Sequence, residues 1–179
     1  IARQAAPADW YLMVSNGNLE RYMPPFKSLS GPERWDVIAY AFSLSTSADE
    51  IAGGQELYAQ NCSDCHGETG QGDGIKTGEL SASPVDFTDQ SFMGMISAAD
   101  LFATISAGQG EMHAFGDLAE ADRWALTAYL RSLTFAAPEA QANLEDGSSD
   151  ATPAGAESPE STPQPAETPV EAGPETDAT

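Results

Sequence analysis

The stretch Cys62-Ser63-Asp64-Cys65-His66 decides how this chain is interpreted, because it holds both cysteines and one of the two histidines. Two thiols three residues apart, followed directly by an imidazole, lie on one helical turn. That arrangement attaches a haem through its two vinyl groups and supplies a nitrogen ligand for the iron. We expect Cys62 and Cys65 to form thioethers and His66 to be the proximal ligand.

Two other sites fit a Cys-x-x-Cys pair, namely a thioredoxin-like redox centre and half of a zinc site. A redox pair has no use for the adjacent histidine and belongs in a βαβ context that this sequence lacks. Zinc requires further cysteine or histidine ligands, and only His113 remains. Both alternatives fit the sequence less well than a haem.

An internal repeat organises the rest of the chain. Residues 23–44 match residues 112–133 at a constant offset of 89 positions, with Met, Phe, Leu, Arg-Trp, Ala-Tyr and a final Leu recurring. Each copy predicts a helix ending at a glycine turn, a loop with methionine, and a second amphipathic helix. Ser30 with Glu33 predicts a capping box, whereas Ala119 in the second copy predicts a less sharp helix start.

Residues 49–98, which include the Cys-x-x-Cys-His, have no counterpart before the first copy. We therefore expect residues 1–46 to be the C-terminal half of a truncated domain and residues 49–135 to be a complete one. The alternative is an N-terminal helical extension packed on the haem domain.

The last segment, residues 136–179, has no aromatic residue, no Lys and no Arg. Such a composition cannot offset its ordering entropy, so we expect a disordered tail that serves as a spacer or only as a solubilising segment.

The chain is strongly acidic, with a formal net charge of -21. Ten of the 28 acidic residues lie in the tail, which leaves 18 acids against seven Lys and Arg before it. Nucleic acid is therefore an improbable partner, and a protein partner recognised by charge should carry a basic patch. No apolar run is long enough for a transmembrane helix, and no signal peptide is recognisable.

The iron also needs a distal ligand, for which Met93, Met95, Met112 and His113 are the candidates. Met112 is favoured because it is matched in the repeat, follows a glycine turn and precedes the closing helix. Met93 and Met95 are expected to line the haem pocket.

Residues 49–135 resemble a small class I cytochrome c domain, of the type found in bacterial periplasmic cytochromes and in subunits of haem-copper oxidases. The matching residues are Gly54, Tyr58, Cys62, Cys65, His66, Gly67, Gly72-Asp73-Gly74, Pro84 to Asp89, Gly108, Met112 and Arg123-Trp124 to Leu130. The resemblance implies an all-α fold of three to five helices around one covalently bound haem c. It also implies that the first and last helices cross at Gly54, where Tyr58 meets Leu126 and Tyr129.

The same resemblance implies roles for single residues. Met112 would be the distal ligand, and the Pro84 carbonyl would accept a hydrogen bond from the other nitrogen of His66. Apart from the resemblance, the apolar spacing of its helix predicts that Trp124 packs in the core or against the haem, and the internal repeat makes Met23 the orphan ligand of a missing haem.

One departure concerns the residue after Met112, where the family usually has proline and this chain has His113. The loop is therefore expected to be more mobile. His113 is either a competing iron ligand or a surface residue.

These expectations favour a single-electron carrier over an enzyme, as a module of a dihaem or larger respiratory protein with redox protein partners. The alternative is a haem c protein with a labile distal ligand that binds or reduces a small molecule such as peroxide or nitric oxide. The family further implies the bacterial periplasm or another extracytoplasmic location.

Overall fold

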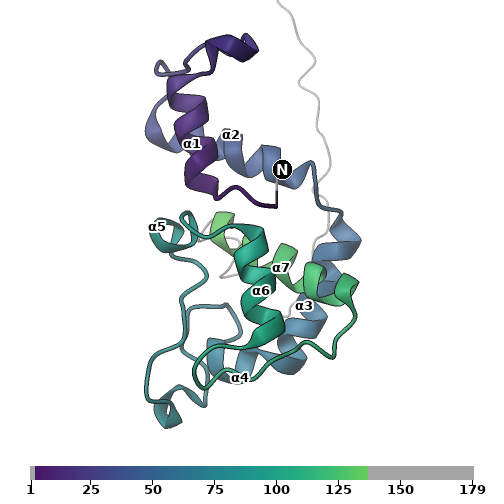
Figure 1. The fold of residues 1–179 in the computed structure, drawn as a ribbon. Helices are drawn as coiled ribbons and strands as arrows, with labels where there is room; N and C mark the ends of the chain where they lie inside the picture. Colours follow the sequence, from purple (N-terminus) through teal and green to yellow (C-terminus); the bar gives the residue numbers. More distant parts are fainter. Residues whose placement is uncertain (1–2, 137–179) are drawn as a thin grey trace, which may run out of the picture. The chain divides into compact units, whose positions relative to one another are not determined.

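A computed structural model gives the fold of residues 3–136. Their regular elements are all helices, joined by loops (Figure 1), and the only β-type pairings of residues 3–136 are the isolated bridges Asn18–Met23 and Gln109–Met112. The helices are α1 (Pro7–Asn16), η1 (Leu19–Arg21), α2 (Gly31–Ser43), α3 (Ala48–Asn61), α4 (Ser63–His66), η2 (Thr77–Glu79), α5 (Gln90–Met93), α6 (Ala98–Ala107) and α7 (Glu120–Phe135). The all-α class is confirmed. The tail predicted for residues 136–179 lies, from residue 137 onward, outside the described residues.

Helices α3 and α7 cross at a glycine and form the most extensive contact between helices. A Cβ on Gly54 would collide with the carbonyl oxygen of Ala125 and lie 2.9 Å from the Tyr129 Cβ, so this approach requires glycine. The rings of Tyr58 and Tyr129 pack with their centroids 5.2 Å apart, and Leu126 is buried in the same cluster. The predicted crossing of the first and last helices of this domain is confirmed.

One hydrophobic cluster holds this domain together. Its buried members are Tyr58, Phe87, Met93, Leu101, Ile105, Leu126, Tyr129, Leu130 and Leu133. They come from α3, α5, α6, α7 and the loop before α5. Burying one large apolar side chain stabilises a fold by about 1.5–3 kcal/mol, so this cluster is the main source of the domain's stability.

Arg131 in α7 is a buried cation that links helices. Its guanidinium donates to the Met93 carbonyl at 2.8 Å and to the Ile96 carbonyl at 2.5 Å. Burial lowers the pKa of Arg131 to about 10, so the side chain still carries its charge at neutral pH. The two bonds fix the end of α5 against α7.

Helices α1 and α2 pack on each other and also contact the domain that follows them. The Ala8 amide donates to the Gly94 carbonyl at 2.8 Å. The Phe42 ring of α2 stacks on Phe135 of α7 with centroids 6.0 Å apart. Among residues 3–136, no helix has the length and hydropathy that a membrane span requires.

The two long closing helices begin differently, as the sequence predicts. At the start of α2 the Ser30 hydroxyl accepts from the Glu33 amide at 3.4 Å, and the Glu33 carboxylate accepts from the Ser30 amide at 2.7 Å. This is the predicted capping box. Ala119 precedes α7 and makes no side-chain cap.

Candidate functional site

The Cys-x-x-Cys-His segment begins where α3 ends at Asn61. The Cys62 carbonyl accepts from the amides of Cys65 at 3.1 Å and His66 at 2.9 Å, which forms the single turn α4. Gly67 ends this turn with φ +80°, a conformation that glycine adopts without steric cost. Cys62 and His66 therefore stand four residues apart, on one side of the turn.

Neighbouring segments fix the backbone at His66. The Tyr58 hydroxyl of α3 donates to the Gly67 carbonyl at 2.7 Å. The Gly72 amide, from the loop after the turn, donates to the His66 carbonyl at 2.8 Å. The imidazole is thus carried by a backbone that is hydrogen-bonded from two sides, which is what a positioned metal ligand needs.

Met112 lies in a short loop that is held at both ends. Gln109 and Met112 exchange two backbone hydrogen bonds, each 3.0 Å long, and Gly108 before them has φ +72°. The Glu111 carboxylate accepts from the Ser81 amide at 2.7 Å and the Ser81 hydroxyl at 2.6 Å, and these bonds lower the pKa of Glu111. The loop is therefore tied to the residues after η2, although it lacks the usual proline.

A narrow cleft brings three of the expected site residues together: Cys62, His66 and Met112. The complete lining is Tyr58, Cys62, His66, Phe87, Ile105, Met112, Phe115, Leu126 and Leu130. Apart from the imidazole, the two sulfur groups and one tyrosine, these side chains are hydrocarbon, as in most cofactor sites. Cys65 is in the same turn as His66 and is half-buried.

The His66 ring is half-buried, with the Phe87 ring stacked on it at a centroid distance of 4.8 Å. Burial lowers the pKa of His66, which leaves the imidazole neutral at pH 7 and able to ligate a metal. The Val85 backbone partly opposes this shift. It does not, however, form a hydrogen bond of good geometry with the buried Nδ1, which has no partner among residues 3–136.

The expected acceptor for this nitrogen was the Pro84 carbonyl. That carbonyl oxygen lies beside Gly72, 2.6 Å from where an added Cβ would stand, and the Val85 carbonyl oxygen lies 3.5 Å from the same point. Val85, the next residue, is the one whose backbone influences His66. The expected segment therefore lies beside the imidazole, and the role of the Pro84 carbonyl stays a prediction.

The pKa of the Cys62 thiol is shifted in the opposite direction from that of a redox-active thiol. Burial, with a smaller contribution from Cys65, raises the pKa of Cys62 to about 11. Redox-active cysteines react as thiolates, and their pKa is lowered to about 3.5–7.5. The zinc alternative also finds no support, since residues 3–136 hold no group of three His, Cys, Asp or Glu side chains placed to bind a metal.

The other three candidates for the distal ligand lie outside the cleft. Met93 is fully buried in the hydrophobic cluster, and Met95 is 70% exposed. His113 is exposed, with its ring centroid 4.2 Å from that of Phe115. Of the four candidates, Met112 is the one that lines the cleft.

Trp124 and Met23 are also placed away from the cleft. The Trp124 ring stacks on Phe102 at 4.2 Å and has the Arg3 guanidinium 3.8 Å from its centroid. It precedes Leu126 by two residues, which is about 200° around the helix, and Leu126 faces the cleft. Met23 is in the first copy of the repeat, bridged to Asn18.

Several residues of the cleft could have been found from the sequence. Leu126 and Leu130 are four residues apart on one helix, and Phe115 is matched by Phe26 in the repeat. Phe87, which lines the cleft, and Ser81, which holds the Met112 loop through Glu111, are in irregular segments, where no periodicity indicates which way a side chain points. Their contributions required the structure.

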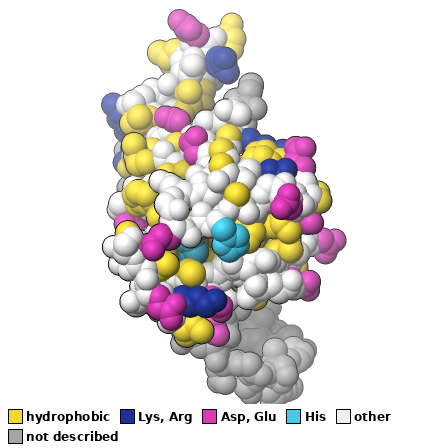
Figure 2. Space-filling view, turned by 60° about the horizontal axis from the view of Figure 1, so that its bottom comes forward, with side chains coloured by type: hydrophobic (Ala, Val, Ile, Leu, Met, Phe, Trp, Pro, Cys, Tyr) yellow, Lys and Arg dark blue, Asp and Glu magenta, His cyan; other side chains and the backbone are white. Residues whose placement is uncertain are grey.

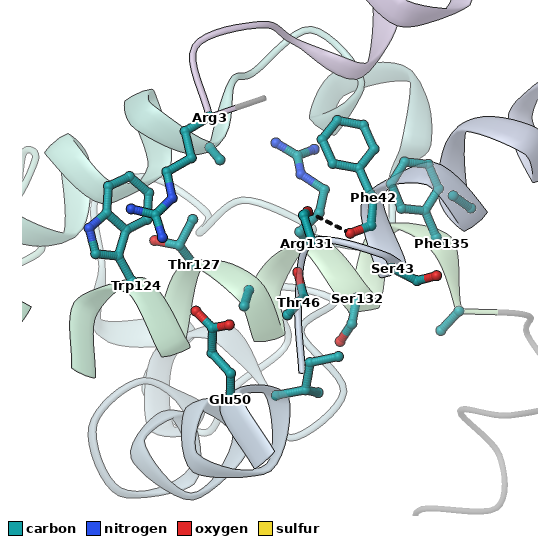
Figure 3. Close-up of a pocket in the computed structure, with 16 residues that line it drawn as sticks. Arg3, Phe42, Ser43, Thr46, Glu50, Trp124, Thr127, Arg131, Ser132 and Phe135 are labelled. Atoms are coloured by element: carbon teal, nitrogen blue, oxygen red, sulfur yellow. Dashed lines mark hydrogen bonds between the residues drawn. The ribbon is translucent and has the colours of Figure 1, made fainter. Parts of the chain in front are cut away.

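A larger cavity of about 330 Å³ lies elsewhere, among α2, α3 and α7. Figure 3 shows the Arg3 side chain beside Trp124, and the rings of Phe42 and Phe135 near Arg131. The Arg131 guanidinium carbon is 5.9 Å from the Phe42 ring centroid. None of the residues lining this cavity is Cys, His or Met, so it offers none of the ligands that the sequence predicts.

The side chains around the narrow cleft have the chemistry that a covalently attached haem c requires. The turn provides two thiols, the imidazole is neutral with a buried Nδ1, and a thioether faces the same apolar space. Figure 2 shows histidine side chains at the surface of one face with apolar side chains beside them. Cys62, His66 and Met112 are each half-buried, so the site is not sealed from solvent. An open edge of this kind allows electron exchange with another protein.

Residues 49–130 match the family described as "Cytochrome C oxidase, cbb3-type, subunit III". Among solved structures, a chain of the Kuenenia stuttgartiensis reducing HAO-like protein complex is 27% identical. That match covers 71% of each chain with a TM-score of 0.45. Among curated proteins, none matches the sequence.

Proposed function

We propose that this chain is a one-electron carrier with a single haem c attached at Cys62 and Cys65, because residues 49–130 form a class I cytochrome c domain. His66 would be the proximal ligand and Met112 the distal one. When bound, the haem iron supplies the one-electron couple. The observation that carries the proposal is the apolar cleft that contains Cys62, His66 and Met112 together.

The chain's own residues have three tasks in this function. The hydrogen bond from Tyr58 to the Gly67 carbonyl holds the attachment turn, and Glu111 holds the Met112 loop through Ser81. The hydrocarbon walls keep water from the iron and favour a high potential. No side chain has to take or give a proton for an electron to pass.

Electron transfer also implies partners and a location. We propose a module of a dihaem or larger respiratory assembly, whose redox partners carry basic patches that complement the acidic surface. An extracytoplasmic location, such as the bacterial periplasm, belongs to the same proposal, since haem c is attached on that side of the membrane in the family. Fractionation of the producing cells tests the location.

The distal ligand is tested by the absorption spectrum of the oxidised holoprotein. The wild type should show the weak far-red band of sulfur-to-iron charge transfer and should bind carbon monoxide poorly. Met112→Leu should lose the band and bind carbon monoxide, because the distal position then has no ligand. Met95→Leu is the matched control, since Met95 is 70% exposed, and its spectrum should be unchanged.

The opposite spectrum would identify the alternative function, a haem c protein that binds or reduces a small molecule. A wild-type protein that lacks the far-red band and binds carbon monoxide readily would have a labile or absent distal ligand. It would then act on a small molecule such as peroxide or nitric oxide. A band that persists in Met112→Leu but disappears in Met95→Leu would assign the ligand to Met95.

A further inference from the structure

The two copies of the repeat share one loop conformation around their methionines. Gly17 and Gly108 have φ of +70° and +72°. A Cβ on Gly17 would lie 2.6 Å from the Met23 carbonyl oxygen, and a Cβ on Gly108 would collide with the carbonyl oxygen of Met112. In both copies a backbone bridge closes the loop at the methionine. Met23 and Met112 therefore hold the same position in the same local fold.

The helices on either side of the loop also make the same contacts. Arg34 donates to the Ser15 hydroxyl at 2.5 Å, and Arg123 donates to the Ser106 hydroxyl at 2.5 Å. Each arginine lies 4.7 Å from the centroid of an aromatic ring that stacks on a tryptophan, Tyr11 with Trp35 in the first copy and Phe102 with Trp124 in the second. The relation between the copies is thus one of structure as well as of sequence.

The copies differ in what covers the closing helix. In α7, Leu126, Tyr129 and Leu133 are 1%, 5% and 3% exposed. Their equivalents along α2 are Val37, Tyr40 and Leu44, which are 44%, 67% and 71% exposed. We call these three residues the α2 face. Their spacing by three and four residues makes one apolar stripe, a pattern typical of a helix surface that packs against another element.

The second copy shows what covers such a stripe. There α3 packs on α7, with Tyr58 against Tyr129, and then leads directly into the Cys-x-x-Cys-His turn. The haem-bearing turn and Met112 share one cleft as a result. The first copy has the methionine and the stripe, but no residue of α3 or α4 is left to cover them, because these helices already pack in the second copy.

We propose that α1, the Met23 loop and α2 form the distal half of a second haem site. The α2 face docks a polypeptide segment that carries a haem c, consisting of an amphipathic helix followed by Cys-x-x-Cys-His. The Met23 thioether is the distal ligand of that second iron. This inference rests on the proposed function of the first site, because it uses the second copy as its template.

The test adds a haem-bearing probe to the intact holoprotein. The probe is a ferric peptide with the sequence of residues 48–66 and a haem c on its two cysteines, so that its iron has a free distal position. One equivalent should bind and add a second contribution to the far-red band. Met23→Leu should lose the added contribution alone, and Met13→Leu, another methionine of the same unit, should keep it.

A second pair of variants tests the docking surface. Tyr40→Asp places a charge in the centre of the α2 face and should weaken binding of the haem peptide by about tenfold or more. Ile75→Asp is the control, because Ile75 is 88% exposed and lies in the loop before η2, outside the first copy of the repeat. Its affinity for the peptide should equal that of the wild type.

Three outcomes would overturn the inference: no binding of the peptide, a second band that survives Met23→Leu, or equal binding by Tyr40→Asp. A dimer of the chain that Tyr40→Asp dissociates would assign the face to a second copy instead. Failure of the proposed function is a separate result. It appears before any peptide is added, as the absence of the far-red band from the holoprotein itself.

Discussion

Two adjacent glycines in α3 meet very different surroundings. An added Cβ on Gly54 would collide with the Ala125 carbonyl of α7, whereas nothing lies within 4 Å of a Cβ on Gly53. The first glycine sets the distance between the two helices that carry the haem site. The second only lowers the helix propensity of α3.

This contrast gives a matched pair of substitutions. Gly54→Ala should lower the free energy of unfolding by about 1–3 kcal/mol, because the backbone of α7 must move away. Gly53→Ala should raise it by up to about 1 kcal/mol, because alanine is the better helix former. Urea denaturation of both holoproteins, followed by circular dichroism, measures the difference. Equal effects would show that the close approach at Gly54 is not required.

Single residues of the site were predictable where a short motif fixes their geometry. Cys62, Cys65 and His66 are in one turn, so spacing alone brings them together. Pro84 and Trp124 depended on how a loop and a helix face are oriented. The segment with Pro84 and Val85 lies beside His66, and Trp124 stacks on Phe102 rather than lining the cleft. A short motif does not define which way a loop or a helix face is turned, because that depends on how distant segments pack.

At the scale of elements, the two closing helices α2 and α7 differ in their first residue. Ser30 caps α2, but Ala119 leaves the first amides of α7 without a side-chain acceptor. The backbone of Ala119, with φ -55° and ψ 148°, is close to that of Ser30. A serine at residue 119 is therefore compatible with the existing backbone.

Ala119→Ser should accordingly stabilise the protein by about 0.5–1 kcal/mol. The new hydroxyl would accept from the amide of Asp122, the third residue of α7. Ala103→Ser, at an exposed position inside α6, is the control and should be slightly destabilising, because serine is a weaker helix former. Thermal unfolding compares the two, and a loss of stability in Ala119→Ser would contradict the argument.

The elements themselves were predictable from periodicity and caps. The alignment of the two copies of the repeat was predicted only in part. The sequence match at an offset of 89 covers the methionine loop and the closing helix. The preceding helices align at an offset of 91, with Gly17 matching Gly108 and Ser15 matching Ser106. The difference lies in the first loop, where η1 adds two residues. A length change inside a loop leaves no periodic signal.

At the scale of the molecule, charge is the dominant property. Residues 1–135 hold eighteen acidic residues and seven Lys and Arg, and one of these cations, Arg131, is buried. The long-range field around the domain is therefore negative. Such a field attracts positively charged partners and repels negative ones over about a Debye length.

The rate of electron exchange should therefore depend on the charge of the reagent and on the ionic strength. Reduction of the holoprotein by a cationic metal complex should slow by about tenfold or more as ionic strength rises, whereas reduction by an anionic complex should accelerate. Stopped-flow absorbance at several salt concentrations measures both rates. Equal salt dependence for the two reagents would mean that the route to the iron is shielded from the net charge.

The close approach at Gly54 also predicts a sequence pattern for the segment that covers the α2 face. A helix that packs against Tyr40 as α3 packs against Tyr129 needs a glycine at the crossing point. In α3 this glycine stands four residues before Tyr58 and eight before Cys62. We therefore expect the covering segment to contain Gly-x3-Tyr-x3-Cys-x2-Cys-His. That pattern can be sought in any candidate sequence before a single structure is determined.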